Sequence, residues 1–459
     1  MEAIEAGKRE SFSSKFGAVM VAAGAAVGLG NIWGFPYQAG KNGGGAFIII
    51  YVVAVLVLGV PLMISEFLIG AKGQKNLVGS LHAASGKSAW KALGWFSIVM
   101  CFLVLAFYGV VAGWSISQFF KALFGGFNGQ SIDTIGESFG AFINGYTPVF
   151  WHFVFMLATA IVVIIGVRKG IERLSKFIMP VLFGILVILA VFGLSLKGSG
   201  AGLAFLFKPD FSVVSWKTVA LACGAAFFSL GVGNGVMVTL GSYMSKGSNL
   251  TKTATQVCFT DTLVAVIAGV AIFPAVFALG FEPTRSSGLA FVTVPAVFQA
   301  FPGGGVVHYL LTLLFFFLLP FAALTSSVAT LEVVVAAFTE ELKMKRVKAS
   351  ILVAAIMFAL GIPCALSVGA VPAINIGGVP LVWFLVDAIE AFMLPLGGIA
   401  FTVFAGWAIK KKDTQELMAV DGKAQWYFNP LYLLIRYVAP IIVFIILLYT
   451  ANEYYHIIK

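Results

Sequence analysis

The sequence predicts an all-α protein that crosses a lipid bilayer many times, and three observations support this fold class. Hydrophobic residues make up 60% of the 459 residues, charged residues make up only 10%, and the mean hydropathy is +1.01. A soluble domain is roughly half apolar and a quarter charged. The apolar stretches are long enough, at about 20 residues, to cross a bilayer as helices. They are continuous rather than alternating, which argues against a transmembrane barrel and leaves helices as the spanning structure.

The apolar stretches predict about eleven membrane spans. Their expected ranges are 15–38, 45–70, 92–124, 147–167, 176–196, 217–245, 253–280, 305–340, 348–367, 379–409 and 430–452. The polar loops expected on the extracytoplasmic side are 125–146, 197–216, 281–304 and 368–378. The resulting divisions are a tail at 1–14, a first five-helix group at 15–196, a second at 217–409 and an additional helix at 430–452.

Lysine and arginine residues gather in alternate loops, and this pattern predicts the orientation of the chain. The cation-rich set is Lys8, Arg9 and Lys15; Lys72, Lys75, Lys87 and Lys91; Arg168, Lys169, Arg173 and Lys176; Lys246 and Lys252; Lys343, Lys345, Arg346 and Lys348; and Lys410, Lys411, Lys412 and Lys423. We expect a multi-pass protein of the cell (inner) membrane, and the positive-inside rule places these loops and the N-terminus on its cytoplasmic side. With an odd number of spans, the C-terminus is extracytoplasmic. No single loop concentrates the net charge of +10, so we expect no nucleic-acid partner.

Cysteine and histidine residues give no sign of a disulfide framework, a transition-metal site or catalysis. The four cysteines lie inside apolar stretches without CxxC spacing, and the four histidines are scattered. The sequence contains no evident pairing of a nucleophile with a base. The tail at 1–14 is polar and mixed in charge, unlike a cleavable signal peptide. An enzyme is therefore the least favoured class of function.

Two spans contain glycine clusters that are unusual for a lipid-facing helix. The first has GAAVGLGN from Gly24 to Asn31, and the sixth has SLGVGNG from Ser229 to Gly235. Glycine is a weak helix former, and an amide facing lipid is costly, so a helix break that lines a cavity is one explanation. Close packing between helices through small residues is the alternative for either segment alone. Because the two segments open the first and second groups of five spans, the pair favours discontinuous helices of the kind found in inverted-repeat transporters.

Several segments, in this order along the chain, resemble the neurotransmitter:sodium symporters, a family with the LeuT fold. They are AAVGLGNIWGFPY with KNGGGAF, GVPLMISEFLIG, KGIERLSKFIMP, FFSLGVGNGV and FAALTSSVATLE. The resemblance covers nearly the whole chain and is closest to prokaryotic sodium-dependent amino-acid transporters. It implies two inverted five-helix repeats, with helices 1 and 6 broken. It also implies symport of sodium, with two ions expected, and an amino-acid-like substrate.

The resemblance implies two sodium sites. The first site matches Ala26, Asn31, Ser229 and Asp261, and the second matches Gly24, Val27, Ala322, Thr325 and Ser326. Asp261 stands where the family usually has asparagine. Chloride-dependent relatives bind chloride near the first sodium, and a fixed carboxylate can supply the same negative charge. We therefore expect transport that does not depend on chloride.

The resemblance also implies a substrate site between the first, third, sixth and eighth spans. Its expected residues are Ala25, Ala26, Leu29, Gly30, Val104, Tyr108, Phe228, Ser229, Gly231, Asn234, Ser326 and Thr330. The substrate carboxylate is expected at Leu29, Gly30 and Tyr108, and its ammonium group at main-chain carbonyls. Asn234, Gly231 and Thr330 depart from the family pattern, which makes this pocket more polar and roomier than one built for leucine.

The gates of the transport pathway also have expected positions. On the cytoplasmic side the resemblance implies an ion pair between Arg9 and Glu340, next to Tyr243 and Phe12. Solvated charge is an equal alternative for Glu340, which ends a span. On the outside, Gly34 replaces the usual gate arginine, and Val382 or Trp383 replaces its partner, so aromatic packing must close this side. Glu66 is expected to brace the sixth-span break and to be able to hold a proton there. Asp387 is expected in the outer vestibule, whereas Glu332 and Glu390 have no predicted role.

These expectations lead to a sodium-coupled symporter that works by alternating access. A proton-coupled amino-acid carrier is the first alternative, with Glu66 or Asp261 carrying the proton. A channel or receptor on the same scaffold is the second. The sequence does not name the substrate.

Overall fold

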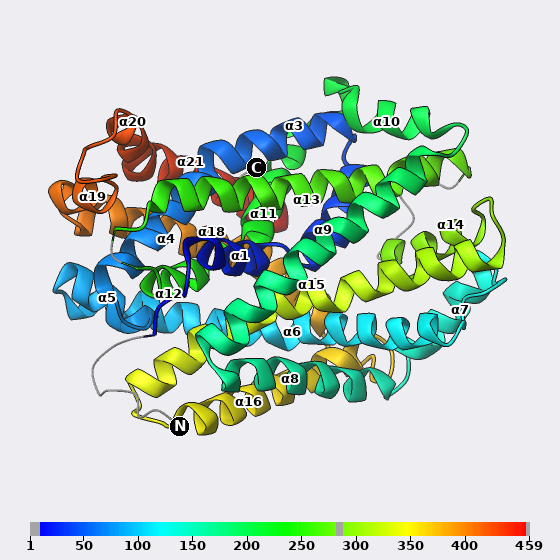
Figure 1. Cartoon of the computed structure of the whole chain (residues 1–459), viewed down its shortest axis with the longest axis horizontal. Coiled ribbons are helices and arrows are strands. Elements are labelled where there is room, and N and C mark those ends of the chain that lie inside the picture. The colour runs from blue at the N-terminus through cyan, green and yellow to red at the C-terminus, as the bar shows by residue number, and fades with distance from the viewer. Residues whose placement is uncertain (1–9, 246, 281–287, 456–459) are drawn as a thin grey trace.

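A computed structural model of the chain describes residues 10–245, 247–280 and 288–455, and within them the fold is a bundle of long helices. Most of these helices run roughly along the longest axis of the molecule (Figure 1). Short helices lie near the two ends of the bundle. They are α5 (Leu77–Ser85), α19 (Lys411–Leu417) and α20 (Phe428–Leu433) at one end, and α7 (Ile132–Ile143), α10 (Ser199–Phe207) and α14 (Val294–Gln299) at the other.

Nine helical segments in the described part of the chain are long and apolar enough to cross a membrane. They are Gly45–Gly73, Ser88–Leu123, Thr147–Ile165, Val167–Ser195, Leu250–Ala278, Gly305–Glu340, Arg346–Ser367, Leu381–Ala408 and Phe428–Glu453. The first predicted span adds a tenth, because Lys15–Ala26 and Gly30–Lys41 form one apolar pair bent by 53°. The sixth predicted span is divided between α11 (Trp216–Leu230) and α12 (Val236–Ser242). The protein is therefore a multi-pass membrane protein.

The segments consist of the following elements. The bent first pair contains α1 (Lys15–Ala26), η1 (Gly30–Gly34) and α2 (Phe35–Lys41). The first five of the nine segments contain, in order, α3 (Gly45–Ala54), η2 (Val55–Gly59) and α4 (Val60–Gly73); η3 (Ser88–Trp90) and α6 (Lys91–Leu123); α8 (Thr147–Ile165); η4 (Val167–Glu172) and α9 (Arg173–Leu194); and α13 (Leu250–Ala278). The last four contain α15 (Gly305–Glu340); α16 (Arg346–Ser367); α17 (Leu381–Ala388), η7 (Ile389–Met393), α18 (Leu394–Val403) and η8 (Phe404–Ala408); and α20, η9 (Leu434–Val438) and α21 (Ala439–Tyr455). The remaining elements are η5 (Phe211–Val213), η6 (Leu289–Thr293) and the hairpin β1 (Asn375–Ile376) and β2 (Val379–Pro380).

Two differences from the expected spans have clear local causes. The fifth span begins at Val167 rather than at 176, because Gly166 turns the chain at φ 106° and a helix starts directly after it. The expected loop at 125–146 contains α7. This helix is capped by the Ser131 hydroxyl, which accepts from the Thr134 N–H, and it buries Ile135 and Phe139 against the bundle. A short amphipathic helix is stabilised by such a cap and buried face.

The helices pack in two groups that matter for the site. In one group α6, α8, α15 and α16 lie against one another, and α1 lies against α9, α13 and α15. In the other, α12 lies directly on α4. Gly70 of α4 and Gly241 of α12 permit this approach. A Cβ atom on Gly70 would be 2.0 Å from the Val238 carbonyl oxygen, and one on Gly241 would be 2.9 Å from the Phe67 carbonyl oxygen. The two helices therefore touch through their backbones.

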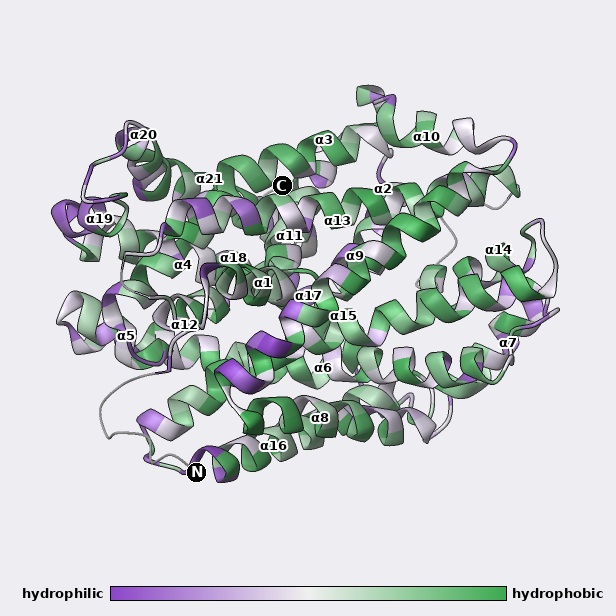
Figure 2. Ribbon diagram, in the orientation of Figure 1, coloured by the Kyte–Doolittle hydropathy of each residue, from purple (hydrophilic) through white to green (hydrophobic). Residues whose placement is uncertain are grey.

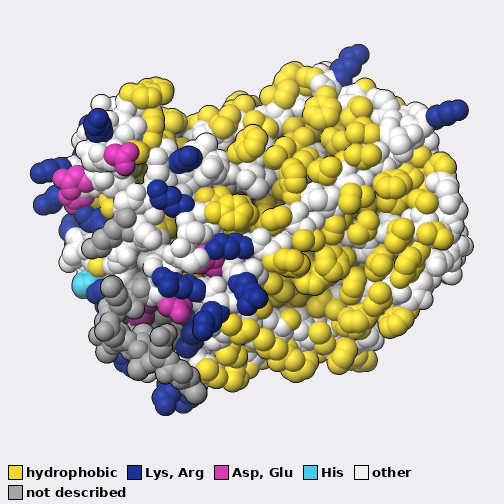
Figure 3. Space-filling view, in the orientation of Figure 1, with side chains coloured by type: hydrophobic (Ala, Val, Ile, Leu, Met, Phe, Trp, Pro, Cys, Tyr) yellow, Lys and Arg dark blue, Asp and Glu magenta, His cyan; other side chains and the backbone are white. Residues whose placement is uncertain are grey.

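The distribution of side chains over the surface agrees with a membrane-spanning bundle. The long helices are coloured as hydrophobic over most of their length, and hydrophilic residues gather toward the ends (Figure 2). In the space-filling view, hydrophobic side chains cover a broad area, and most lysine and arginine side chains of that face lie at the end that holds α19 (Figure 3).

Candidate functional site

The first helix is broken where the sequence predicts it. Helix α1 ends at Ala26, Val27 is extended at ψ 108°, and a helix resumes at Gly30. The Asn31 side chain holds this break, because its Oδ1 accepts a hydrogen bond from the Gly28 N–H at 2.9 Å. A helix end leaves main-chain carbonyls and N–H groups without helical partners. The break therefore exposes polar backbone in the middle of the bundle.

The sixth segment is broken by three glycines with positive φ. Gly231, Gly233 and Gly235 have φ of 59°, 91° and 80°, conformations that other residues adopt only with strain. Glu66 of α4 braces this break as expected, since its Oε1 accepts from the Gly233 N–H at 2.6 Å. Glu66 is fully buried, and its other oxygen has no hydrogen-bond partner among the described residues.

A buried carboxylate lies between the two breaks. Asp261 of α13 accepts hydrogen bonds from Asn31 Nδ2 at 2.7 Å, Ser229 Oγ at 2.8 Å and Tyr51 Oη at 3.2 Å. Asp261 is fully buried, and no lysine or arginine pairs with it in the described part of the chain. A buried carboxylate with only neutral partners is costly, so this cluster is suited to a small cation. The predicted residues Asn31, Ser229 and Asp261 are thus brought together, and Ala26 lies in the adjoining cavity.

Tyr51 is a member of this cluster that the sequence motifs do not predict. It is the only polar side chain in the apolar run from 46 to 62, and it is fully buried. A lone polar side chain in a spanning helix is a signal that could have identified it.

A second cluster of hard oxygen atoms lies where α1 ends against α15. Ser326 Oγ is 3.2 Å from both the Gly24 and the Val27 carbonyl oxygens. The neighbouring Thr325 hydroxyl donates to the Ala322 carbonyl at 2.9 Å. All five residues predicted for the second sodium site are therefore close together. The donor set is neutral and made of oxygen, which suits a hard cation of low charge.

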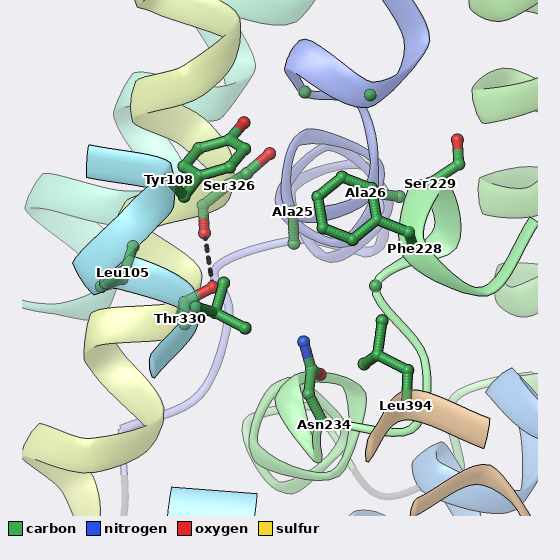
Figure 4. Close-up of a pocket in the computed structure, with 14 residues that line it drawn as sticks. Ala25, Ala26, Leu105, Tyr108, Phe228, Ser229, Asn234, Ser326, Thr330 and Leu394 are labelled. Atoms are coloured by element: carbon green, nitrogen blue, oxygen red, sulfur yellow. Dashed lines mark hydrogen bonds between the residues drawn. The ribbon is translucent and has the colours of Figure 1, made fainter. Parts of the chain in front are cut away.

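The cavity between the breaks contains nearly all of the predicted substrate residues (Figure 4). Its lining is Ala25, Ala26, Gly28, Gly30, Val104, Leu105, Tyr108, Phe228, Ser229, Gly231, Asn234, Ser326, Thr330 and Leu394. Leu29 lies next to it, and its N–H donates to Tyr108 Oη at 3.1 Å. Gly28, Leu105 and Leu394 were not predicted. Leu105 and Leu394 are apolar residues of apolar spans, so nothing in their local sequence distinguishes them from packing residues.

A larger cavity of about 530 Å³ adjoins this one and is lined by Trp33, Gly34, Trp383, Asp387 and Glu390 among others. Four residues line both cavities and therefore lie between them: Gly30, Tyr108, Phe228 and Ser229. Trp33 and Trp383 pack edge to face, with ring centroids 6.4 Å apart. Of the two residues considered for the outer-gate position, Trp383 lines this cavity. Val382 is buried, and its N–H donates to Ser367 Oγ.

The predicted cytoplasmic gate is partly described. Arg9 lies outside the described residues. Glu340 Oε2 accepts hydrogen bonds from the N–H and side chain of Asn76, at 2.8 and 3.0 Å. Phe12 and Tyr243 pack edge to face with ring centroids 6.1 Å apart, and the Phe12 N–H donates to the Tyr243 carbonyl at 3.0 Å.

Glu332, for which no role was predicted, joins this region. Its carboxylate accepts from Tyr243 Oη at 2.6 Å and pairs with Arg346 at 2.5 Å. Glu332 is fully buried, so the pairing satisfies a charge that would otherwise be costly. The contact fixes the end of α12 to the junction of α15 and α16.

Comparisons with known proteins agree with this geometry. The chain matches the model of the sodium:neurotransmitter symporter family over residues 9–134 and 138–458. It is 36% identical over 445 residues to the sodium-dependent transporter YhdH of Bacillus subtilis, covering 96% of this chain and 97% of the relative. It is 33% identical over 451 residues to a sodium-dependent transporter of Haemophilus influenzae, covering 96% and 97%.

The fold is similar to that of MhsT, whose crystal structure was solved in complex with L-phenylalanine. The TM-score is 0.90 and the sequence identity 38%, with 96% of this chain and 100% of the other covered. The relatives are transporters rather than enzymes, and they use sodium. The chain therefore belongs to the sodium:neurotransmitter symporter family and has the LeuT fold that the sequence predicts.

Proposed function

We propose that the chain is a sodium-coupled symporter that imports an amino acid or a closely related small zwitterion by alternating access. One observation carries the proposal: two serines belong both to the cavity and to the cation clusters. Ser229 lines the cavity and donates to Asp261, and Ser326 lines it and contacts the carbonyls of α1. A cation at either cluster therefore fixes a wall of the cavity, which couples the two binding events reciprocally.

The broken helices supply groups of opposite polarity for a zwitterion. The N–H groups of Leu29 and Gly30, at the start of the second half of the first span, would hold the substrate carboxylate together with Tyr108 Oη. Carbonyl oxygens near the ends of α1 and α11, at Ala25, Phe228 and Ser229, would hold its ammonium group. This is the arrangement expected of an amino acid bound by its main-chain groups.

Two sodium ions are proposed as co-substrates. The first would be held by Ala26, Asn31, Ser229 and Asp261, and the second by Gly24, Val27, Ala322, Thr325 and Ser326. Asp261 carries a fixed negative charge next to the first site, which is the reason to propose transport without chloride.

The proposed cycle moves the broken-helix bundle against a scaffold. Its repeats are 15–196 and 217–409, the N-terminus is cytoplasmic, and the C-terminus is extracytoplasmic. The grouping of lysine and arginine side chains at one end supports this orientation (Figure 3). Packing among Tyr108, Phe228, Trp33 and Trp383 would close the outer side.

Uptake by purified protein in sealed vesicles tests the proposal. A sodium gradient should drive accumulation of a labelled amino acid without chloride, and a pH gradient without sodium should not. Ser326→Ala should weaken sodium dependence about tenfold, because it removes one of the five proposed ligands of the second site. Asp261→Asn should weaken sodium binding and introduce a chloride requirement.

The matched control is Asp210→Asn, the same chemical change on an exposed loop, which should alter neither ion dependence. Three results would contradict the proposal in different ways. Accumulation driven by protons alone would support a proton-coupled carrier, and equilibration without accumulation would support a channel or receptor. An Asp261→Asn variant with unchanged sodium and chloride dependence would refute the role assigned to Asp261 in the first sodium site and the chloride argument with it.

A further inference from the structure

One end of the substrate cavity is polar, and its two polar side chains come from separate elements. Asn234 lies in the sixth-segment break, and Thr330 lies on α15. Both line the cavity, where only 6% and 7% of their surfaces remain exposed (Figure 4). What each side chain can offer a substrate depends on the hydrogen bonds that it already makes.

The orientation of the Asn234 amide follows from chemistry. The Val236 N–H donates to Asn234 Oδ1 at 3.0 Å, and a main-chain N–H can only be paired with an acceptor, so the oxygen must be on that side. The Nδ2 group then points into the cavity (Figure 4), and no described residue accepts a hydrogen bond from it. Asn234 therefore presents a donor to the substrate.

Thr330 presents the complementary group. Its hydroxyl donates to the Ser326 carbonyl at 3.0 Å, the contact drawn as a dashed line in Figure 4. Because its proton is used within α15, the Thr330 oxygen faces the cavity as an acceptor. The polar end of the cavity thus offers one donor and one acceptor.

The remaining walls restrict the charge of the substrate side chain. Val104, Leu105, Phe228 and Leu394 are apolar, and no charged side chain belongs to the lining in the described part of the chain. A carboxylate would meet no cation there, and an ammonium or guanidinium group would meet no carboxylate. An apolar side chain would leave the Asn234 amide unpaired, which costs about 1–3 kcal/mol.

We propose that this transporter selects a neutral amino acid whose side chain ends in a hydroxyl or carboxamide group. Such a group accepts from Asn234 Nδ2 and donates to Thr330 Oγ1. The inference rests on the proposed function, since it concerns the side chain of an amino acid held in this cavity. Discrimination by a site built for hydrogen bonding is larger than discrimination by shape alone.

Sodium-dependent binding of matched amino-acid pairs tests the proposal. Purified protein is titrated with threonine and valine, tyrosine and phenylalanine, and glutamine and methionine. The tightest ligand should be the polar member of its pair and should bind at least tenfold more tightly than its apolar counterpart, or about 1.4 kcal/mol. A tightest ligand that is apolar, or a pair difference below twofold, would overturn the inference while leaving sodium-coupled transport intact. If no amino acid shows sodium-dependent binding, the proposed function fails and the inference fails with it.

Two variants identify the groups responsible. Thr330→Val keeps the shape and removes the hydroxyl, which is both the acceptor for the substrate and the donor to the Ser326 carbonyl, so it should reduce the difference within the preferred pair about tenfold without weakening the apolar member. Asn234→Leu should do the same, but it also removes the acceptor for the Val236 N–H. Val104→Ile, a change of shape alone, should leave the preference for the polar member in place. If Thr330→Val and Val104→Ile have the same effect, the selectivity arises from shape and the inference is wrong.

Discussion

Replacing Glu66 with leucine should destabilise the sixth-segment break by a predictable amount. Glu66 Oε1 is the acceptor for the Gly233 N–H at 2.6 Å, and both residues are buried. The Gly233 backbone is closely packed in this position, with φ 91° and so little space that a Cβ atom there would lie 2.3 Å from the Leu394 carbonyl oxygen. A buried N–H without a partner costs about 1–3 kcal/mol, which changes a conformational equilibrium roughly 5- to 150-fold.

Two measurements on the Glu66→Leu variant check this reasoning. Sodium-dependent substrate affinity should fall, since the binding-competent break becomes a smaller fraction of the population, and the thermal unfolding midpoint should fall with it. Glu66→Gln is the matched control, because its amide oxygen can still accept from Gly233. If the leucine variant binds and unfolds like the unaltered protein, the brace contributes nothing. If glutamine is as damaging as leucine, the cause is the carboxyl group itself and not the hydrogen bond.

Two further predictions concern stability. Gly361→Ala should lower the thermal unfolding midpoint by the equivalent of about 1–3 kcal/mol, because the new Cβ would lie 2.2 Å from Nε2 of the buried His152; an unchanged midpoint would mean that the three helices around His152 can separate. The hydrogen bond from Lys72 lowers the pKa of Asp413 below its ordinary value of 3.8, so this contact stabilises α19 at neutral pH, weakens as the pH falls below 3.8 and is lost once the pH passes the lowered pKa. Asp413 is about a third exposed, so the effect should stay below about 1 kcal/mol. Hydrogen exchange of α19 should be faster in Asp413→Asn than in the unaltered protein at pH 6, and this difference should shrink as the pH falls below 3.8; a difference that stays constant over that fall would contradict the assignment.

The parts of the site that were predicted from sequence lie in short strings with unusual composition. Glycine clusters in apolar spans marked both breaks, and Asp261 was evident as an acid at membrane depth. These signals are local, because glycine and buried charge each have a physical cost that must be explained where it occurs. The approximate bounds of the long spans followed from apolar length in the same way.

The parts that were missed depend on tertiary packing. Leu394 reaches the cavity from the tenth predicted span, and nothing in its neighbourhood separates it from a lipid-facing leucine. Glu332 pairs with Arg346, which lies 14 residues further along the chain and on the next helix. The local sequence around either residue therefore does not identify the other as its partner. The sequence predicts a loop where α7 lies, because the stabilisation of this helix comes from burying one face against the bundle rather than from apolar length.

The contact between α4 and α12 has a mechanical consequence. At Gly70 and Gly241 the backbone of each helix touches the other, without intervening side chains that could change rotamer and absorb a sliding movement. Two helices in direct backbone contact cannot slide past each other in small steps, so α4 and α12 either move together or lose the contact completely. In the proposed cycle α12, the cytoplasmic half of the sixth segment, would therefore move together with α4 of the second span as one rigid body. The flexible joint of the transporter would lie at Gly231–Gly235, where three successive changes of backbone direction are already built in.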